Sequence, residues 1–248
     1  MNYLVGDIGN TLIKLSILDS NFKIKEIYNL ETKKIFKISS KKQFLNKFIK
    51  KKLNKKILFS SVVPKAYKLI KKYFIKNGFK VIEIKDLKIK KIIKIKIKKY
   101  NQLGSDRILN AIASSNYKNA IVIDFGTATT FDIIKNGIYV GGVISPGVNL
   151  SILNLNSSTA LLPLFNLRKI KKSYGKNTQE ALNAGFIWGY QGLINNIIKK
   201  ISSKTKVNYK IILTGGYAKL FKKYVKFKSI VDQNVTIKGI SKTYKELL

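Results

Sequence analysis

The stretch IVIDFGTATTFDI, residues 121–133, places an Asp-x-Gly element between two β-branched segments. A related element, DIGNT at 7–11, stands between two such segments near the start of the chain. The two elements are separated by close to half of the 248 residues. This repeat predicts one α/β domain duplicated, with residues 1–117 and 118–248 as its two copies.

Short β-branched runs indicate strands, and apolar residues at helical spacing indicate helices. These elements follow a similar order in both copies. Strands are predicted at 2–8, 11–18, 22–30, 57–63, 120–125, 129–135, 138–144, 210–214 and shortly after 229. Helices are predicted from Phe44 to Leu53, from Pro64 to Gly78, at 147–157, 178–201 and 217–224, and at the end of the chain. Residues 88–99, with alternating Ile and Lys, predict an edge strand with a lysine face, or alternatively a basic loop. Each copy is thus expected to be a mixed sheet flanked by helices.

The chain contains no Cys and no His, and 45% of its residues are apolar. The apolar content is that of a packed globular protein, whereas the two absences exclude disulfides, thiolate nucleophiles, zinc–cysteine sites and imidazole bases. Any catalysis must use Asp, Glu, Lys, Ser, Thr, Tyr or a bound cation. No apolar run approaches the roughly 20 residues of a membrane helix, and the first residues do not fit a signal peptide, so we expect a soluble cytoplasmic protein.

The formal net charge is +37, and Arg107 and Arg168 are the two arginines among 49 basic residues. Base-reading surfaces favour arginine, because its planar fork makes two hydrogen bonds to one base. The abundance of Lys together with Ile and Asn is typical of translation from an AT-rich genome. We therefore expect no specific nucleic-acid partner, although so large a charge should attract polyanions nonspecifically at low salt.

The DIGNT element and Lys14 have the residue types of a phosphate-binding turn. The glycine would let the backbone approach an anion, Asn10 and Thr11 would add donors, and Lys14 would reach a terminal phosphate. Asp7 would then hold a hydrated Mg²⁺. Taken alone, the element fits a β-hairpin with a Gly-Asn turn slightly better, so both interpretations stay open.

The second element, from Asp124 to Asp132, is less readily explained as a plain hairpin, because it gathers three hydroxyls and two carboxylates around one glycine. If a pseudo-twofold axis relates the two copies, both Asp-x-Gly elements would face one cleft and would bind a nucleoside triphosphate. Gly215 and Gly216, after the strand expected at 210–214, would let an adenine ring lie against the backbone. Such a pair is also an ordinary strand-to-helix turn.

The sequence GSDR at 104–107 precedes an apolar helical pattern. A plain helix start explains Ser105 as the N-cap and Asp106 in the first turn. It does not explain why one of only two arginines follows that aspartate. The three motifs also contain four of the twelve acidic residues, which favours a functional origin. These four are Asp7, Asp106, Asp124 and Asp132.

A long helix is expected after Asn177, because Asn177 as N-cap and Glu180 three residues later fit a capping box. From spacing alone, Thr178 as a ligand is the weaker interpretation. The helix contains three glycines between 184 and 198, which lower helix stability unless another element packs closely against them. We expect a contact with another domain or subunit at these glycines.

Six segments in order make the chain similar to type III pantothenate kinase, a family of the acetate and sugar kinase, heat-shock 70 and actin superfamily. They are DIGNTLIK, LGSDRILNAIA, IVIDFGTATTFDI, GGVISPGVNLSILNLNSSTALLP, NTQEALNAGFIWGYQGLI and ILTGG. The resemblance implies two duplicated ribonuclease H-like domains of the actin-like ATPase kind. It also implies transfer of the ATP γ-phosphoryl group to the 4′-hydroxyl of pantothenate, the first step toward coenzyme A. Mg²⁺, a monovalent cation (K⁺ or NH₄⁺) and a homodimer are further implications.

The resemblance also assigns roles to single residues. Asp106 would be the base for the pantothenate hydroxyl, Asp124 the monovalent-cation ligand, and Thr127 an ATP contact. The ATP phosphates would bind the first motif, which comprises Asp7, Ile8, Gly9, Asn10, Thr11, Leu12, Ile13 and Lys14. Pantothenate would contact Tyr100, Gly104, Ser105, Asp106, Arg107 and Thr178. Tyr100 departs from the family pattern, because it stands closer to Gly104 than the family tyrosine does and no proline lies between them.

Two other functions stay open from sequence alone. One is an ATP-binding regulator that lacks kinase activity, which the intact Asp106–Arg107 pair disfavours. The other is a basic nucleic-acid-binding protein, which the scarcity of arginine disfavours. Measuring ADP release with and without pantothenate would separate the kinase from both.

Overall fold

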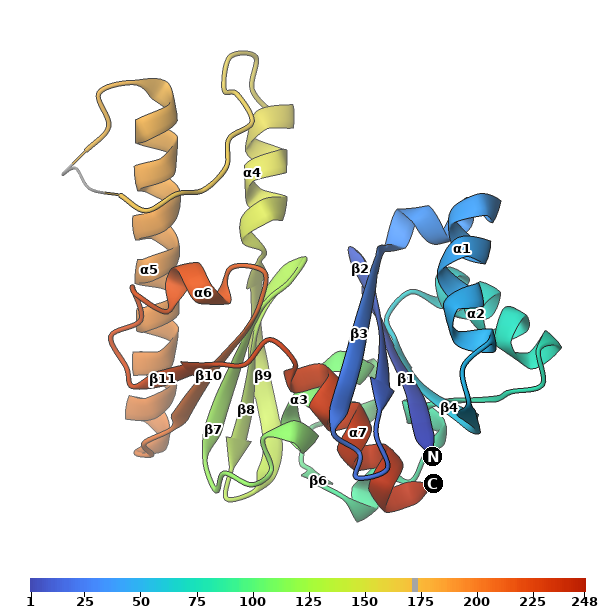
Figure 1. The fold of residues 1–248 in the computed structure, drawn as a ribbon. Helices are drawn as coiled ribbons and strands as arrows, with labels where there is room; N and C mark the ends of the chain where they lie inside the picture. Colours follow the sequence, from blue (N-terminus) through green and yellow to red (C-terminus); the bar gives the residue numbers. More distant parts are fainter. Residues whose placement is uncertain (171–173) are drawn as a thin grey trace. The chain divides into compact units, whose positions relative to one another are not determined.

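The computed structural model describes residues 1–170 and 174–248 (Figure 1). Its contacts group the chain into two compact units. The first unit comprises residues 1–116, 137–140 and 234–248, and the second comprises residues 117–136 and 141–233. Each unit is built around strands of its own and has its own apolar core.

A five-stranded sheet with the order β3-β2-β1-β4-β5 forms the centre of the first unit. Its strands are β1 (Asn2–Ile8), β2 (Leu12–Leu18), β3 (Ile24–Glu31), β4 (Leu53–Ser61) and β5 (Lys80–Glu83). The first three are antiparallel neighbours, whereas β4 runs parallel to both β1 and β5. The carboxyl ends of β1, β4 and β5 therefore meet at one edge of the sheet.

Helices cover both faces of this sheet (Figure 1). On one face, α1 (Ile38–Ile49) and α2 (Pro64–Lys76) bury apolar stripes that include Phe48 and Phe74. Val5 and Leu58 point to the opposite face and are also fully buried. Near them, α3 (Ser105–Ala113) packs against α7 (Val235–Leu247), and α7 also contacts β1 and β4. Short 3₁₀ turns complete the unit: η1 (Thr32–Phe36), η2 (Ile84–Asp86), η3 (Ile89–Lys91) and η4 (Tyr100–Gln102).

The second unit has a sheet with the order β9-β8-β7-β10-β11. Its strands are β7 (Ala120–Phe125), β8 (Ala128–Lys135), β9 (Ile138–Pro146), β10 (Lys210–Gly215) and β11 (Ser229–Val231), although residues 138–140 of β9 group with the first unit. Its helices are α4 (Val148–Ser157), α5 (Thr178–Thr205) and α6 (Ala218–Phe221). Its core gathers apolar residues of the central strands and of these helices, including Ile187 of α5 and Phe221 of α6.

The two sheets repeat one topology. In each, an antiparallel hairpin that carries the Asp-x-Gly element is followed by two parallel strands on the far side of its first strand. The orders β3-β2-β1-β4-β5 and β9-β8-β7-β10-β11 correspond strand by strand. The structure therefore confirms the predicted fold class, a duplicated α/β architecture with mixed sheets flanked by helices.

The compact units differ from the predicted halves at the C-terminus. Residues 234–248 pack with the first unit, because the apolar face of α7 lies against α3, β1 and β4. A boundary near residue 117 for the duplication itself stays a prediction, since packing identifies which residues lie together rather than which were copied.

Two local expectations from the sequence are wrong, and a third holds for two residues only. Leu53 begins β4 instead of ending α1. Within 88–99, only Lys94–Ile95 form a strand, β6, which pairs with Ile138–Tyr139; Ile89 and Ile93, four positions apart, are both buried, so the chain turns helically at η3. Gly104 is the N-cap of α3, and Ser105 is the first helical residue.

Within the described residues, no helix combines the length and the apolar character needed to cross a membrane.

Candidate active site

The β1–β2 turn has a backbone that is closed on itself and braced by a threonine. Gly9 N–H donates to the carbonyl of Leu12 at 3.0 Å, and the hydroxyl of Thr32 donates to the carbonyl of Gly9 at 2.7 Å. The side chains of Asn10 and Thr11 are exposed. The turn therefore offers backbone amides and two polar side chains, as a phosphate-binding element requires.

Two residues assigned to this motif point elsewhere. Ile8 and Ile13 are fully buried and belong to the apolar core of the first unit. Any contact that they make with a phosphate must therefore come from their backbone.

Asp7 is flanked on both sides by polar residues of neighbouring strands. It pairs in register with Lys14 of β2 and with Ser60 of β4. Desolvation is the largest cause that raises the pKa of Asp7 to about 6, and the negative charge of Asp106 is the second. Ser60 and Lys14 lower this pKa without cancelling the rise. The structure thus brings Asp7 and Asp106, which are far apart in sequence, into one electrostatic site within the first unit.

Asp106 lies in the first turn of α3, where its side chain is fixed by the local backbone. Its Oδ1 accepts a hydrogen bond from Arg107 N at 2.8 Å. A Cβ atom on Gly104 would lie 2.4 Å from the same oxygen. Gly104 therefore leaves room for the carboxylate to fold over the start of the helix, where the helix dipole favours a negative charge.

Ser105 has a different role from the one expected for it. Its side chain is fully buried and makes no capping hydrogen bond. Burial and then the charge of Asp86 raise the pKa of Glu83, at the end of β5, above its usual value. The Ser105 hydroxyl offsets a small part of this rise, although its Oγ makes no hydrogen bond of normal geometry to a described residue. Glu83 is thus a third carboxylate next to the GSDR motif.

Tyr100 lies in the short turn η4 of the first unit. Its half-buried ring lines a cavity of about 420 Å³ together with Lys85, Leu87, Lys88, Ile89, Lys90 and Lys91. The Nζ of Lys90 lies 5.8 Å from the centre of the ring. The cavity therefore suits a ligand that carries a negative charge.

In the second unit, Asp124 occupies the position that corresponds to Asp7. It pairs in register with Thr130 of β8 and Thr214 of β10. Gly215 has a φ of +84°, and a Cβ at this position would lie 2.5 Å from Asp124 Oδ1. The absence of a side chain at Gly215 therefore makes room for the carboxylate.

The turn that contains Thr127 packs on the N-terminus of α4. A Cβ atom on Gly147, the N-cap of α4, would lie 2.1 Å from the backbone oxygen of Thr127. The Thr127 side chain is exposed. This contact fixes the backbone of the turn and leaves its hydroxyl accessible.

Thr178 is the first residue of α5 and is exposed. The expected cap is present, because Asn177 Oδ1 accepts from Glu180 N at 2.9 Å. The return bond differs from a capping box, since Glu180 Oε2 accepts from Lys176 N at 3.0 Å. Thr178 lies at one end of a mainly apolar groove of about 670 Å³ along α4 and α5. The groove is also lined by Pro146, Ser151, Leu155, Leu162, Ala181, Leu182, Gly185, Phe186, Gly189, Tyr190 and Leu193.

The sequence reasoning missed Ser60, Glu83 and Thr214. They lie at or near the carboxyl ends of three parallel strands: Ser60 in β4, Glu83 in β5 and Thr214 in β10. A sequence signal existed for two of them, because Ser60 ends the apolar run 57–59 and Thr214 precedes the glycine pair. Their place beside the aspartates depends on strand pairing, which the sequence did not specify.

Asp7 and Asp124 offer oxygen donors that suit different cations. In the described part of the chain, no three His, Cys, Asp or Glu side chains lie close enough to form a metal site by themselves. Asp7 nevertheless fits a Mg²⁺ ion that keeps most of its ligands as water and phosphate, because a cation there would offset the repulsion from Asp106. Asp124 with two neighbouring threonines offers the oxygen donors that suit an alkali cation.

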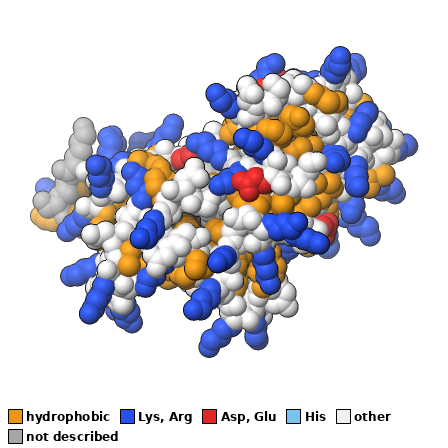
Figure 2. Space-filling view, turned by 90° about the horizontal axis from the view of Figure 1, so that it is seen from below, with side chains coloured by type: hydrophobic (Ala, Val, Ile, Leu, Met, Phe, Trp, Pro, Cys, Tyr) orange, Lys and Arg blue, Asp and Glu red, His pale blue; other side chains and the backbone are white. Residues whose placement is uncertain are grey.

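On the face drawn in Figure 2, basic side chains are scattered instead of forming one patch. Figure 2 shows lysines and arginines across the whole visible face, with apolar and neutral areas between them. An electrostatic footprint for nucleic acid usually follows one face or one helix. The absence of a specific nucleic-acid partner stays a prediction.

Comparison with known proteins identifies one family of similar sequences. A family model described as type III pantothenate kinase matches residues 3–200. A type III pantothenate kinase of Pelagibacter ubique is 47% identical over 240 residues, 96% of each chain. One of Fusobacterium nucleatum is 33% identical and covers 96% of this chain and 97% of its own.

Solved structures with the same fold carry other names. A Baf family protein of Campylobacter jejuni, named as a transcriptional activator, has a TM-score of 0.62 and 26% identity over 98% of both chains. The activator of 2-hydroxyisocaproyl-CoA dehydratase from Clostridium difficile, with bound ADPNP, has a TM-score of 0.59. It is 13% identical and covers 98% of this chain and 94% of its own, so it supports the fold alone.

Proposed function

Because the chain belongs to the type III pantothenate kinase family, we propose that it phosphorylates pantothenate with ATP, the first step of coenzyme A biosynthesis. The observation that best supports this function is that Asp7 and Asp106 lie close enough in one unit to influence each other's charge. Asp7 lies at the phosphate-binding turn and Asp106 at the start of a helix. A kinase needs both parts: a turn that binds the nucleotide phosphates and a carboxylate beside it that accepts a proton.

In the proposed reaction, the 4′-hydroxyl oxygen of pantothenate forms a bond to the γ-phosphorus of ATP. The bond from that phosphorus to the β–γ bridging oxygen breaks, so ADP leaves with the electron pair. Asp106 accepts the hydroxyl proton, while the turn after β1 and Lys14 stabilise the charge on the phosphates. Asp7 is the residue that would hold Mg²⁺, which would neutralise part of that charge when bound.

The other assignments follow the same proposal. Gly104, Ser105, Arg107, Thr178 and Tyr100 are proposed to surround pantothenate, and Thr127 to contact ATP. The lysine-lined cavity beside Tyr100 supports its assignment despite the short loop, because pantothenate carries a carboxylate.

The proposal predicts that ADP release depends on pantothenate. Purified protein with Mg-ATP and K⁺ should release ADP much faster when pantothenate is added, and the phosphorylated product should form in equal amount. A coupled ADP assay together with product analysis by mass spectrometry measures both quantities. ADP release at the same rate without pantothenate would leave an ATPase or regulator and remove the kinase assignment.

We also propose that Asp124 binds a monovalent cation, K⁺ or NH₄⁺. Replacing K⁺ by Na⁺ should lower kcat on the order of tenfold, because the smaller ion fits the same oxygens less well and a bound cation is a large local charge. Asp124→Asn should have a low kcat in both buffers, and its kcat should no longer differ between K⁺ and Na⁺. Equal rates of the wild-type protein in sodium and potassium would contradict this proposal.

A homodimer is proposed from the glycines of α5. At Gly185, Gly189 and Gly192, an added Cβ would meet no described atom within 4 Å, so packing inside the chain does not explain them. Trp188 on the same helix is 43% exposed. The protein should sediment as a dimer at micromolar concentration, and Gly189→Glu should shift it toward monomer. The matched surface change Asn196→Glu should not, and a wild-type monomer would remove the proposal.

A further inference from the structure

The helices α3 and α7 of the first unit touch through their backbones. Gly239 of α7 is buried, and a Cβ atom there would lie 2.2 Å from the carbonyl oxygen of Leu109 and 3.0 Å from its Cα. Because the obstacle is backbone, no side-chain rotation could relieve it. Any other residue at 239 must therefore move α3 and α7 apart, by about 1 Å for a single methyl group.

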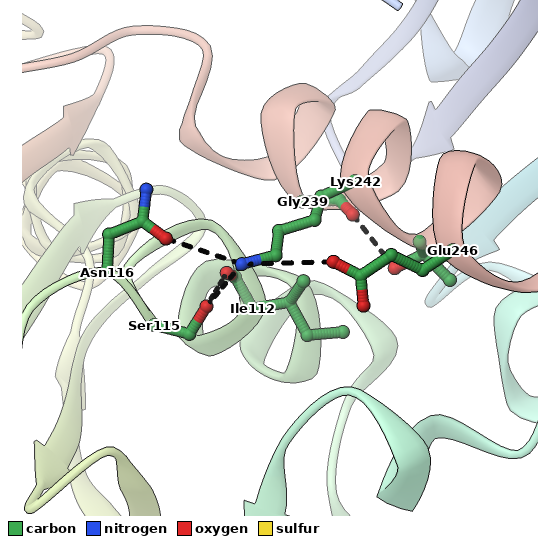
Figure 3. A network of polar contacts seen from close by, with 7 residues as sticks. Ile112, Ser115, Asn116, Gly239, Lys242 and Glu246 are labelled. Carbon is green, nitrogen blue, oxygen red and sulfur yellow. Dashed lines mark hydrogen bonds and ion pairs between the residues drawn. The ribbon is translucent and has the colours of Figure 1, made fainter.

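Polar contacts fix the register of the two helices on either side of this glycine. Thr236 donates to Asn110 Oδ1 at 3.1 Å. Beyond the C-terminal end of α3, Lys242 Nζ donates to Ser115 Oγ at 2.8 Å and to Asn116 Oδ1 at 3.4 Å (Figure 3). Ser115 in turn donates to the carbonyl of Ile112, so the lysine also supports the last turn of α3.

The opposite side of α7 is anchored to the central strands. The hydroxyl of Tyr244 donates to the carbonyl of Lys56 in β4 at 3.0 Å. Its ring also packs against Tyr3 of β1 and against Phe22. The strands β1 and β4 are those whose carboxyl ends carry Asp7 and Ser60. Thus α7 connects the strands that hold the phosphate-binding turn with the helix whose first turn holds Asp106.

We infer that Gly239 is a positioning residue for phosphoryl transfer: by allowing α7 to contact α3, it keeps Asp106 in place relative to Asp7. This inference rests on the proposed role of Asp106 as the base. Gly239 lies against Leu109, three positions after Asp106 in a nine-residue helix. Because so short a helix moves nearly as a rigid body, a displacement at Leu109 shifts the first turn as well.

The test is Gly239→Ala, with Thr243→Val as the matched control. Thr243 is also buried on α7, but its hydroxyl donates to the carbonyl of Gly239 within the same helix. Alanine favours a helix over glycine, so any loss comes from the contact with α3. We expect kcat to fall about 10- to 100-fold, since a misplacement of about 1 Å costs up to 10²-fold. The KM for ATP should stay within twofold, and Thr243→Val should keep kcat within twofold.

A double-mutant cycle with Asp106→Asn separates positioning from loss of stability. In single turnover well below the melting temperature, Gly239→Ala should have less than a threefold effect when Asp106 is already replaced, because the group that it positions is gone. A wild-type kcat in Gly239→Ala, or the same fold-loss in both backgrounds, would overturn the inference.

The remaining outcomes also decide between the two proposals. If Gly239→Ala does not fold, Lys242→Met is the test variant in its place. We expect Lys242→Met to lower kcat threefold or more, and to have no such effect when Asp106 is already replaced by Asn. An unchanged or additive effect of Lys242→Met would overturn the inference. A wild-type rate in Asp106→Asn alone would remove the base assignment and this inference with it, whereas a slow Asp106→Asn beside a normal Gly239→Ala removes only the inference.

Discussion

Replacing Asp106 by asparagine is expected to lower kcat by about 10²- to 10⁴-fold, the usual contribution of a general base. The substitution keeps the shape of the side chain, and Asn Oδ1 can still accept the hydrogen bond that Arg107 N now donates to Asp106 at 2.8 Å. The KM for ATP should change little, because the phosphate-binding turn is untouched. Steady-state kinetics with varied ATP and pantothenate, together with the melting temperature, measure these effects.

Asp19→Asn is the matched control for this change. Asp19 belongs to the same unit, and its Oδ1 likewise accepts backbone hydrogen bonds, from Asn21 and Lys23. This variant removes one negative charge from a turn and should keep wild-type kinetics. If Asp106→Asn is within twofold of wild type in kcat, Asp106 is only a residue of the first helical turn.

The duplicated order of strands could be predicted from the sequence because it depends on local patterns. The β-branched runs around DIGNT and DFGTA are long enough to specify a hairpin each, and the later apolar runs match β4 and β10. Helix starts were equally local, as Pro64 at the beginning of α2 and the cap at Asn177 show. The alternating Ile and Lys residues of 88–99 predicted a strand, but Ile89 and Ile93 are buried at a spacing of four residues, which is that of a helical turn.

The composition of the site could be predicted only in part, because strand pairing and helix docking bring its residues together. Asp7 and Asp106 were found as members of motifs, whereas their electrostatic contact depends on where α3 packs. Ser60 enters the site because β4 pairs with β1 in one register, and a different register would place another residue beside Asp7. The role of Gly239 could not be assigned from the sequence, because the backbone that it contacts is known only from the structure.

Replacing Asp7 by asparagine is expected to stabilise the protein at neutral pH while it impairs the kinase. The folded-state pKa of Asp7 is about 6, compared with a reference value of 3.8. Well below pH 3.8 both folded and unfolded chains keep the proton, so the carboxyl costs nothing. As pH rises from 3.8 through 6, the unfolded chain releases the proton first, and stability is lost until the folded carboxyl ionises too.

One pKa unit corresponds to 1.36 kcal/mol, so the rise from 3.8 to about 6 corresponds to about 3 kcal/mol of unfolding free energy. Because the Asp7 side chain is half-buried, solvent screening reduces this cost to about 2 kcal/mol. A neutral asparagine avoids this cost, so Asp7→Asn should melt about 4–8 °C above wild type at pH 7, given about 2–4 °C per kcal/mol for a chain of this size. At pH 3.5 the two melting temperatures should nearly coincide, since the folded proteins both carry a neutral group at this position and the unfolded Asp7 is mostly protonated. Calorimetry of both proteins at the two pH values, with the Asp19→Asn variant as a reference, measures the difference. Equal melting temperatures at pH 7, or the same difference at both pH values, would show that ionisation of Asp7 does not destabilise the folded protein.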